Sequence, residues 1–193
     1  MKVNIHTHSP KEDELTLSTI GIHPYDAEIA TTDAVLSIER SALGVDAIGE
    51  IGLDYSCKVD RESQELIFKA QLEVAQQYSK GVVLHCVRAF EPTMKILEKY
   101  RLKFVIFHGF IGSKEQALSA TSRGYYLSFG ERTFRSPKSI DAMRATPIDR
   151  LFLETDESHL SIDDIYRKAS ALLAVPENLL EYITNQNFRH ICG

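Results

Sequence analysis

The sequence predicts an α/β fold with a mostly parallel sheet, in a single domain that covers residues 1–193. Short apolar runs alternate with longer amphipathic segments along the chain, and most of the short runs are nearly continuously apolar. Strands covered by helices on both faces have this character, and regular strand–helix alternation is typical of parallel sheets. A barrel of the TIM type, trimmed or open and with about seven strands, is the leading architecture because the length lies just below the roughly 200 residues of the shortest full barrels.

Seven apolar runs are the predicted strands, and amphipathic segments separate most of them. The runs lie at residues 3–8, 16–22, 47–53, 82–87, 104–107, 125–128 and 151–154. Two helices are indicated by apolar side chains at helical spacing, which is the signature of a helix with one buried face. These side chains are Leu66, Ile67, Ala70, Val74 and Tyr78, and Ile165, Ala169, Leu172 and Leu173. Ser113 with Gln116, and Ser161 with Asp164, have the spacing of capping boxes that open helices.

One connection does not fit a regular barrel. Residues 9–15, SPKEDEL, are too few for a helical crossover, which needs about a dozen residues. We therefore expect the first strand–helix unit either to lack its helix or to return as an antiparallel neighbour.

The composition excludes several classes of protein. With 44% apolar and 25% charged residues the chain is typical of a globular protein. No apolar run approaches the roughly 20 residues of a spanning helix and the N-terminus lacks the apolar core of a signal peptide, so we expect a cytoplasmic protein with no membrane partner. Three distant cysteines without a CxxC motif fit reduced thiols, and the net charge of −5 argues against a basic surface for polyanions.

Histidines and carboxylates interrupt or follow the predicted strands. His6 and His8 stand in VNIHTHSP, and alternate side chains of a strand project from the same face. Glu50 interrupts the apolar run AIGEIGLD. The later runs carry or precede His85, His108 and Asp156. Such groups are rarely buried unless they are paired or bind a cation, and the carboxyl ends of barrel strands are where active sites form.

These four histidines and two carboxylates are sufficient ligands for two divalent cations that share a bridging group. A single metal with a nearby partner residue is the alternative. Imidazole-rich ligation suits Zn, Mn or Fe better than Mg, which prefers oxygen ligands, but the residues leave Zn, Mn and Mg open. Bound cations would also give an acidic protein a positive site for an anionic substrate.

The motifs resemble those of the TatD family of metal-dependent deoxyribonucleases, which belong to the amidohydrolase-type barrel hydrolases. The motifs are HTH, GIHPY, AIGEIGLDY, QELIFKAQLEVA, VVLHC, HGFIGS, YYLSFG, LFLETD and NQNFR, in order and nearly from end to end. The resemblance implies hydrolysis of phosphodiesters in DNA, often from the 3′ end, and commonly with magnesium.

Carried over position by position, the resemblance implies two metal sites. The first is surrounded by His6, His8, Glu50 and Asp156. Glu50 also bridges to the second, which His85 and His108 hold. His23 of GIHP matches a family histidine near the substrate.

The chain departs from the family pattern at several positions. Asn4 stands where the family usually has aspartate, which predicts weaker orientation of His6. The family's arginine after the strand of VVLHC is displaced to Arg88, which we assign to substrate binding. A strand–helix unit is missing between His8 and Gly21, and the loop after ETD is short. These changes affect the walls around the site and not its metal ligands.

The predicted function is metal-dependent hydrolysis of phosphodiesters such as DNA, with a hydroxide held between two cations as the nucleophile. Glu50 and Asp156 are the predicted catalytic carboxylates, and Asp156 is the best candidate to receive the proton of the nucleophile. Two alternatives stay open. One is hydrolysis of a carboxylic ester or amide, such as an aminoacyl-tRNA, by the same metal chemistry, and the other is a metal-binding interaction module without turnover. The sequence leaves the oligomeric state open.

Overall fold

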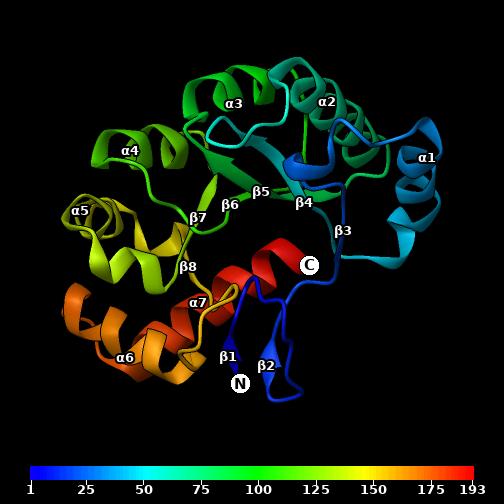
Figure 1. Cartoon of the computed structure of the whole chain (residues 1–193). Coiled ribbons are helices and arrows are strands. Elements are labelled where there is room, and N and C mark those ends of the chain that lie inside the picture. Colours follow the sequence, from blue (N-terminus) through cyan, green and yellow to red (C-terminus); the bar gives the residue numbers. More distant parts are fainter. The chain divides into compact units, whose positions relative to one another are not determined.

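The computed structural model describes all 193 residues and consists of two compact units (Figure 1). The terminal unit combines Met1–Thr16 with His108–Gly193, and the central unit is the continuous segment Leu17–Phe107. Helices and parallel strands make up both units, so the predicted α/β class is confirmed. A single domain over residues 1–193 stays a prediction.

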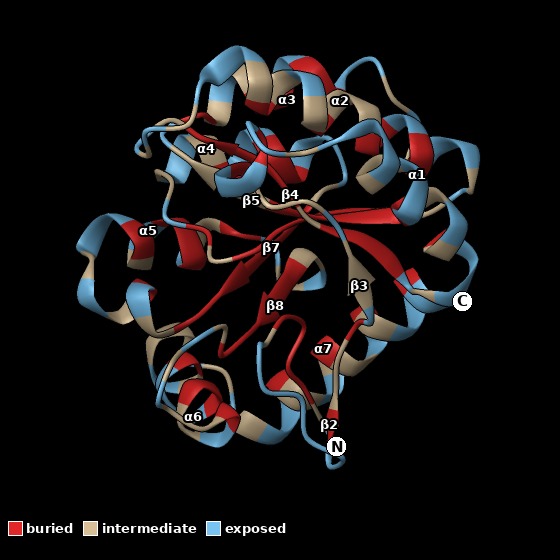
Figure 2. Ribbon diagram, turned by 45° about the vertical axis from the view of Figure 1, so that its right-hand side comes forward, coloured by how far each residue is buried: buried red, intermediate tan, exposed pale blue.

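The central unit is built on four parallel strands that pair in chain order. They are β3 (Thr19–Ile20), β4 (Ala47–Asp54), β5 (Gly81–Val87) and β6 (Val105–Phe107). Its helices are α1 (Thr32–Ser41), α2 (Arg61–Gln77) and α3 (Phe90–Leu97), with short 3-10 helices at Pro24–Asp26 and Ala42–Gly44. The apolar run of β4 is almost completely buried (Figure 2), and α2 packs against it with Phe68, Leu72 and Ala75 buried.

The terminal unit contains two parallel strand pairs, β1 with β2 and β7 with β8. They are β1 (Lys2–Val3), β2 (Glu14–Leu15), β7 (Tyr126–Phe129) and β8 (Leu151–Leu153). Its helices are α4 (Lys114–Ser122), α5 (Pro137–Ala145), α6 (Ile162–Leu173) and α7 (Glu177–Cys192), with 3-10 helices at Glu131–Arg135 and Ile148–Arg150. Helix α7 packs against both β1 and β8, and so joins the start of the chain to its end.

The predicted first strand, residues 3–8, forms a regular ladder only at β1. Beyond β1 the segment has a partner on each side: the Asn4 amide donates to Leu15 O (2.8 Å), and the Ile5 amide donates to Leu153 O (3.1 Å). Thr7 then forms an isolated parallel bridge with Asp156. Because β1 and β2 run parallel without a helix between them, the antiparallel alternative is wrong and the loss of the helix is confirmed.

The other predicted strands and helices are present, and all but one differ little in length from the prediction. The predicted strand 16–22 is regular only at β3. The capping box of Ser113 and Gln116 is confirmed at the start of α4. At the start of α6 only the first bond of the predicted capping box is present: the Ser161 hydroxyl oxygen accepts from the Asp164 amide. The Asp164 carboxylate accepts from the Ser161 hydroxyl (2.7 Å). No helix combines the length and apolar character that a membrane crossing requires. The cytoplasmic location stays a prediction.

Candidate metal centre

The terminal unit brings His6, His8 and Asp156 together. Nε2 of His6 lies 3.8 Å from Oδ1 of Asp156, and Nε2 of His8 lies 3.5 Å from the same oxygen. The two imidazole rings are close to perpendicular, with centroids 5.4 Å apart. One ligand atom from each residue lies within 4.8 Å of the others, a spacing that a single divalent cation can span.

The backbone holds Asp156 in place between the two histidines. Its amide donates to His6 O (3.1 Å), and its carbonyl accepts from the His8 amide (3.3 Å). Asp156 has a φ of 53°, in the left-handed region that costs a non-glycine residue about 1 kcal/mol or more. These hydrogen bonds help to keep the carboxylate turned toward His6 and His8.

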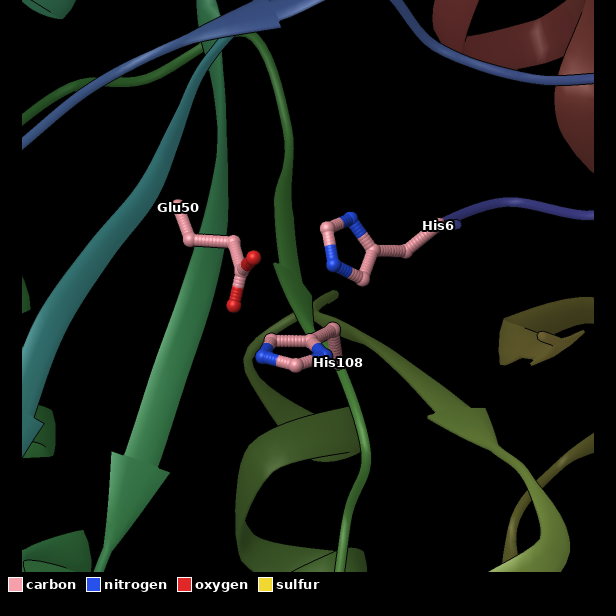
Figure 3. Close-up of side chains that lie close together, drawn as sticks. All are labelled: His6, Glu50 and His108. Atoms are coloured by element: carbon pink, nitrogen blue, oxygen red, sulfur yellow. The ribbon is translucent and has the colours of Figure 1, made fainter. Parts of the chain in front are cut away.

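His108 lies beside His6, with ring centroids 4.5 Å apart (Figure 3). Its Nδ1 lies 3.4 Å from Oε1 of the buried Glu154, so Nε2 is the nitrogen better placed to bind a metal. Burial would raise the pKa of Glu154, but the hydrogen bond and charge of His108, together with the charge of His6, lower it below its ordinary value. The terminal unit therefore holds a buried carboxylate–histidine pair, Glu154 and His108, next to His6 of its metal-ligand group.

The central unit has its own ligand group, formed by His23, Glu50 and His85. Glu50 projects from the middle of β4 (Figure 3), and His85 lies on the adjacent strand β5. Nδ1 of His85 lies 3.8 Å from Oε2 of Glu50. Its Nε2 lies 3.1 Å from Oδ2 of Asp54, which directs Nδ1 toward Glu50 as a potential ligand nitrogen.

Asp54 is held by neighbours that are close in sequence. Its Oδ1 accepts hydrogen bonds from the Ser56 amide and hydroxyl, and its backbone amide and carbonyl both bond to the Gln64 side chain at 2.7 and 2.9 Å. Burial raises the pKa of Asp54, but the hydrogen bonds from Ser56 and His85 and the charge of His85 lower it below its ordinary value. Asp54 is therefore a fixed anion that orients the His85 ring.

His23 is suited to a different task from metal binding. Its Nδ1 accepts a hydrogen bond from the Tyr25 amide (3.2 Å), and a neutral imidazole that accepts at Nδ1 carries its proton on Nε2. Nε2 is then a donor, which fits a phosphate oxygen better than a cation. The loop is fixed because the Gln71 side chain bonds both the amide and the carbonyl of Ile22. Arg88, directly after β5, is exposed and left-handed with a φ of 51°.

The structure places the sequence-predicted residues in two groups. His6, His8, His108 and Asp156 lie together in the terminal unit, while His23, Glu50 and His85 lie together in the central unit. That Glu50 bridges two cations stays a prediction. Sequence reasoning missed Asp54 and Glu154, although both stand in or directly after apolar strands, which was the signal used for the other residues.

Comparison with known proteins identifies the family. Residues 3–193 match the family described as TatD related DNase. The chain belongs to this family. The resemblance noted in the sequence is thereby confirmed. The TatD family is metal-dependent, and both units hold groups of imidazole and carboxylate ligands whose chemistry suits divalent cations.

Several TatD relatives are similar in sequence. The 3′-5′ ssDNA/RNA exonuclease TatD of Escherichia coli (strain K12) is 30% identical over 171 residues, which cover 84% of this chain and 65% of that protein. The protein of the same name from Shigella flexneri serotype 5b has the same identity and coverage. The putative deoxyribonuclease TATDN1 homolog of Enterocytozoon bieneusi is 29% identical over 96% of this chain and 72% of its own length. The chain thus spans slightly less than two thirds of the bacterial TatD relatives.

Solved structures share the fold of this TatD chain. YjjV, a TatD homolog from Escherichia coli K12, superposes with a TM-score of 0.85 at 23% identity, over 94% of this chain and 78% of that protein. A TatD family hydrolase from Entamoeba histolytica gives a TM-score of 0.80 at 20% identity, over 93% of this chain and 75% of that protein. The predicted α/β, TIM-barrel-like fold is confirmed by these likenesses.

Proposed function

We propose that this chain hydrolyses phosphodiester bonds in nucleic acid with the help of divalent cations. The observation that carries the proposal is the group of His6, His8 and Asp156, whose ligand atoms lie within 4.8 Å of one another in a TatD-family chain. Relatives named as 3′-5′ ssDNA/RNA exonucleases support single-stranded DNA or RNA as the substrate.

We infer that each unit's ligand group contributes to cation binding, with two cations per chain. His6, His8 and Asp156 would hold one cation, and Glu50, His85 and His108 are the further ligands. The bound cations would polarise the scissile phosphate and lower the pKa of an attacking water. Histidine-rich ligation supports Zn or Mn over Mg.

The side chains of this protein then have separate tasks. A carboxylate oxygen of Asp156 accepts the proton of the attacking water, and the backbone hydrogen bonds of Asp156 to His6 and His8 hold that carboxylate in position. Nε2 of His23 donates to a phosphate oxygen, and the exposed guanidinium of Arg88 neutralises the phosphate charge. Glu50 would contribute to catalysis as a metal ligand.

A nuclease assay on chelator-stripped protein tests the proposal. The substrates are single-stranded DNA and RNA of one sequence, labelled at the 5′ end, a model phosphodiester, and a carboxylic ester of the same leaving group. We expect no cleavage after chelation, and progressive shortening of the labelled strands when Mn or Zn is returned. Cleavage of the carboxylic ester alone would replace the proposal with acyl hydrolysis, and stoichiometric metal binding without any turnover would favour a binding module.

Variants assign the activity to the proposed residues. Asp156→Asn removes the proton acceptor and a ligand charge, so we expect the rate to fall by about a hundredfold or more. His190→Gln is the matched control because His190 is an exposed histidine near the end of α7 that belongs to neither ligand group. Wild-type activity in Asp156→Asn would contradict the proposed role.

A further inference from the structure

Asn4 lies directly after β1 and is 1% exposed. Both N–H groups and the oxygen of its side-chain amide are bonded, and two residues supply the partners. Its Nδ2 donates to Oε2 of Glu14 (2.7 Å) and to Oγ1 of Thr155 (2.9 Å), and its Oδ1 accepts from the Thr155 amide (2.9 Å). Because a carboxylate must accept and a backbone amide must donate, these partners determine which end of the Asn4 amide is nitrogen.

The residue that Asn4 holds is the immediate neighbour of Asp156. Thr155 is fixed at its amide and at its hydroxyl by Asn4, and the same hydroxyl donates to Oγ1 of Thr7 (3.0 Å). Asp156 follows in the left-handed conformation, bonded through its backbone to His6 and His8. Without these bonds the backbone of Asp156 could relax to a conformation of lower energy, and its carboxylate would turn away from the two histidines.

Glu14 explains why the side chain at position 4 is an amide. Its side chain is 4% exposed, and its second oxygen, Oε1, lies 3.6 Å from Nζ of Lys11. An aspartate at position 4 could still accept from the Thr155 amide, but it would place an acceptor-only carboxylate against the carboxylate of Glu14. Asparagine supplies the donor that this buried contact requires.

We infer that Asn4 and Glu14 form a clamp, and that through Thr155 the clamp positions Asp156 for cation binding. Asn4 is a positioning residue, since its side chain bonds only Glu14 and Thr155 in this network and acts on the cation through Asp156. This inference rests on the proposed function, in that Asp156 is taken to bind a cation. The clamp itself is a contact within the terminal unit and can be measured without metal.

A reciprocal exchange of the amide and the carboxylate tests the clamp. Asn4→Asp opposes two carboxylates, whereas Asn4→Asp combined with Glu14→Gln restores one amide and one carboxylate with the donor direction reversed. We expect Co²⁺ affinity, measured from the visible absorption of the full-length chain, to fall by about tenfold to a hundredfold in Asn4→Asp and to recover largely in the double variant. Amide hydrogen exchange of residues 153–158 in metal-free protein should rise and recover in the same order.

Asn187→Asp is the matched control for loss of a buried amide. Nδ2 of Asn187 donates to Ile148 O and Leu151 O, both at 3.0 Å, so an aspartate there also opposes acceptors but lies outside the clamp. We expect a lower Tm with unchanged Co²⁺ affinity.

Wild-type exchange and Co²⁺ affinity in Asn4→Asp, or a double variant no better than Asn4→Asp, would overturn the inference. If the wild-type protein binds Co²⁺ but cleaves no nucleic acid, the proposed function fails while the clamp stands. If it binds no Co²⁺, the exchange result still decides the clamp, but its link to cation binding fails together with the proposed cation site.

Discussion

Asp54 in the central unit and Glu154 in the terminal unit are both 1% exposed, and each faces a histidine. Asp54 has further partners within ten residues of the chain, because Ser56 bonds its carboxylate and Gln64 bonds its backbone. The partners of Glu154 are distant in the sequence, because Nδ1 of His108 lies 3.4 Å from Oε1 and the charge of His6 and the Ser128 hydroxyl also lower the pKa of Glu154. The carboxylate of the Asp54–His85 pair in the central unit thus has further partners close in the sequence. The carboxylate of the Glu154–His108 pair in the terminal unit depends on distant residues.

The contrast extends to other contacts in the two units. In the terminal unit, the Lys2 ammonium bonds Asp163 and Glu177, which are 161 and 175 residues away. In the central unit, Lys69 bonds Glu65 one helical turn away. The terminal unit is assembled from two distant chain segments, and long-range polar contacts such as these help to join them.

The largest expected difference in the free energy of unfolding is between two single variants of metal-free protein, each of which removes the histidine that faces a buried carboxylate. His108→Ala leaves Glu154 as a buried carboxylate without its partner, which should lower the free energy of unfolding by about 3 kcal/mol. His85→Ala leaves Asp54 bonded by Ser56, so we expect a loss of about 1 kcal/mol. Urea unfolding measures both, and equal losses would remove the distinction between local and distant support.

An intermediate effect is expected for two tyrosine hydroxyls. The hydroxyl of the buried Tyr166 bonds Val3 O (3.0 Å) and Thr184 Oγ1 (2.8 Å), so Tyr166→Phe should cost about 1.5 kcal/mol. Tyr55→Phe in the central unit is the control, since its partly exposed hydroxyl bonds only Glu65 (3.0 Å) and should cost about 0.5 kcal/mol. Thermal unfolding of the two variants would contradict the comparison if Tyr55→Phe were the more destabilised.

The smallest effect is expected at Lys2 and depends on pH. Burial lowers the pKa of Lys2, but the hydrogen bonds and charges of Asp163 and Glu177 outweigh it and raise the pKa above the ordinary value of 10.5. A raised lysine pKa means that the contribution to stability is complete below pH 10.5 and is lost as the pH rises through the folded-state pKa.

Lys2→Met should therefore cost less than about 1 kcal/mol at neutral pH, because Asp163 is largely exposed. The difference from wild type in the free energy of unfolding should shrink as the pH rises above 10.5. Lys69→Met is the control, with a smaller cost from its single surface pair. If the difference in the free energy of unfolding between wild type and Lys2→Met grew at high pH, the predicted direction of the Lys2 pKa shift would be wrong.

The positions of most elements could be predicted from the sequence because their signals are local. The apolar run that became β4 and the cap of Ser113 over Gln116 depend on residues within a few positions of one another. The strand predicted at residues 3–8 is regular only at β1, because the segment beyond it takes partners on both sides, from β2 and from the end of β8. No local pattern encodes which partner each amide finds.

The candidate site divides in the same way. His6, His8 and Asp156 could be named from residue types at strand ends, and their grouping follows from the bridge between Thr7 and Asp156. Asp54 and Glu154 were missed because a carboxylate beside a strand looks the same whether it binds a cation or orients a histidine. Only the direction of the imidazole nitrogens distinguishes the two roles.

The sequence by itself determined the α/β class, the family and the residue types able to bind cations, because apolar periodicity, caps and motif order are properties of short stretches of chain. The tertiary structure decided which donor meets which acceptor. Asn4 and Thr155 are 151 residues apart, and the direction of their hydrogen bonds depends on Glu14 lying against the same amide. Such a contact exists only once both chain segments are packed into one unit, since hydrogen bonding requires atoms within about 3 Å and a fixed orientation.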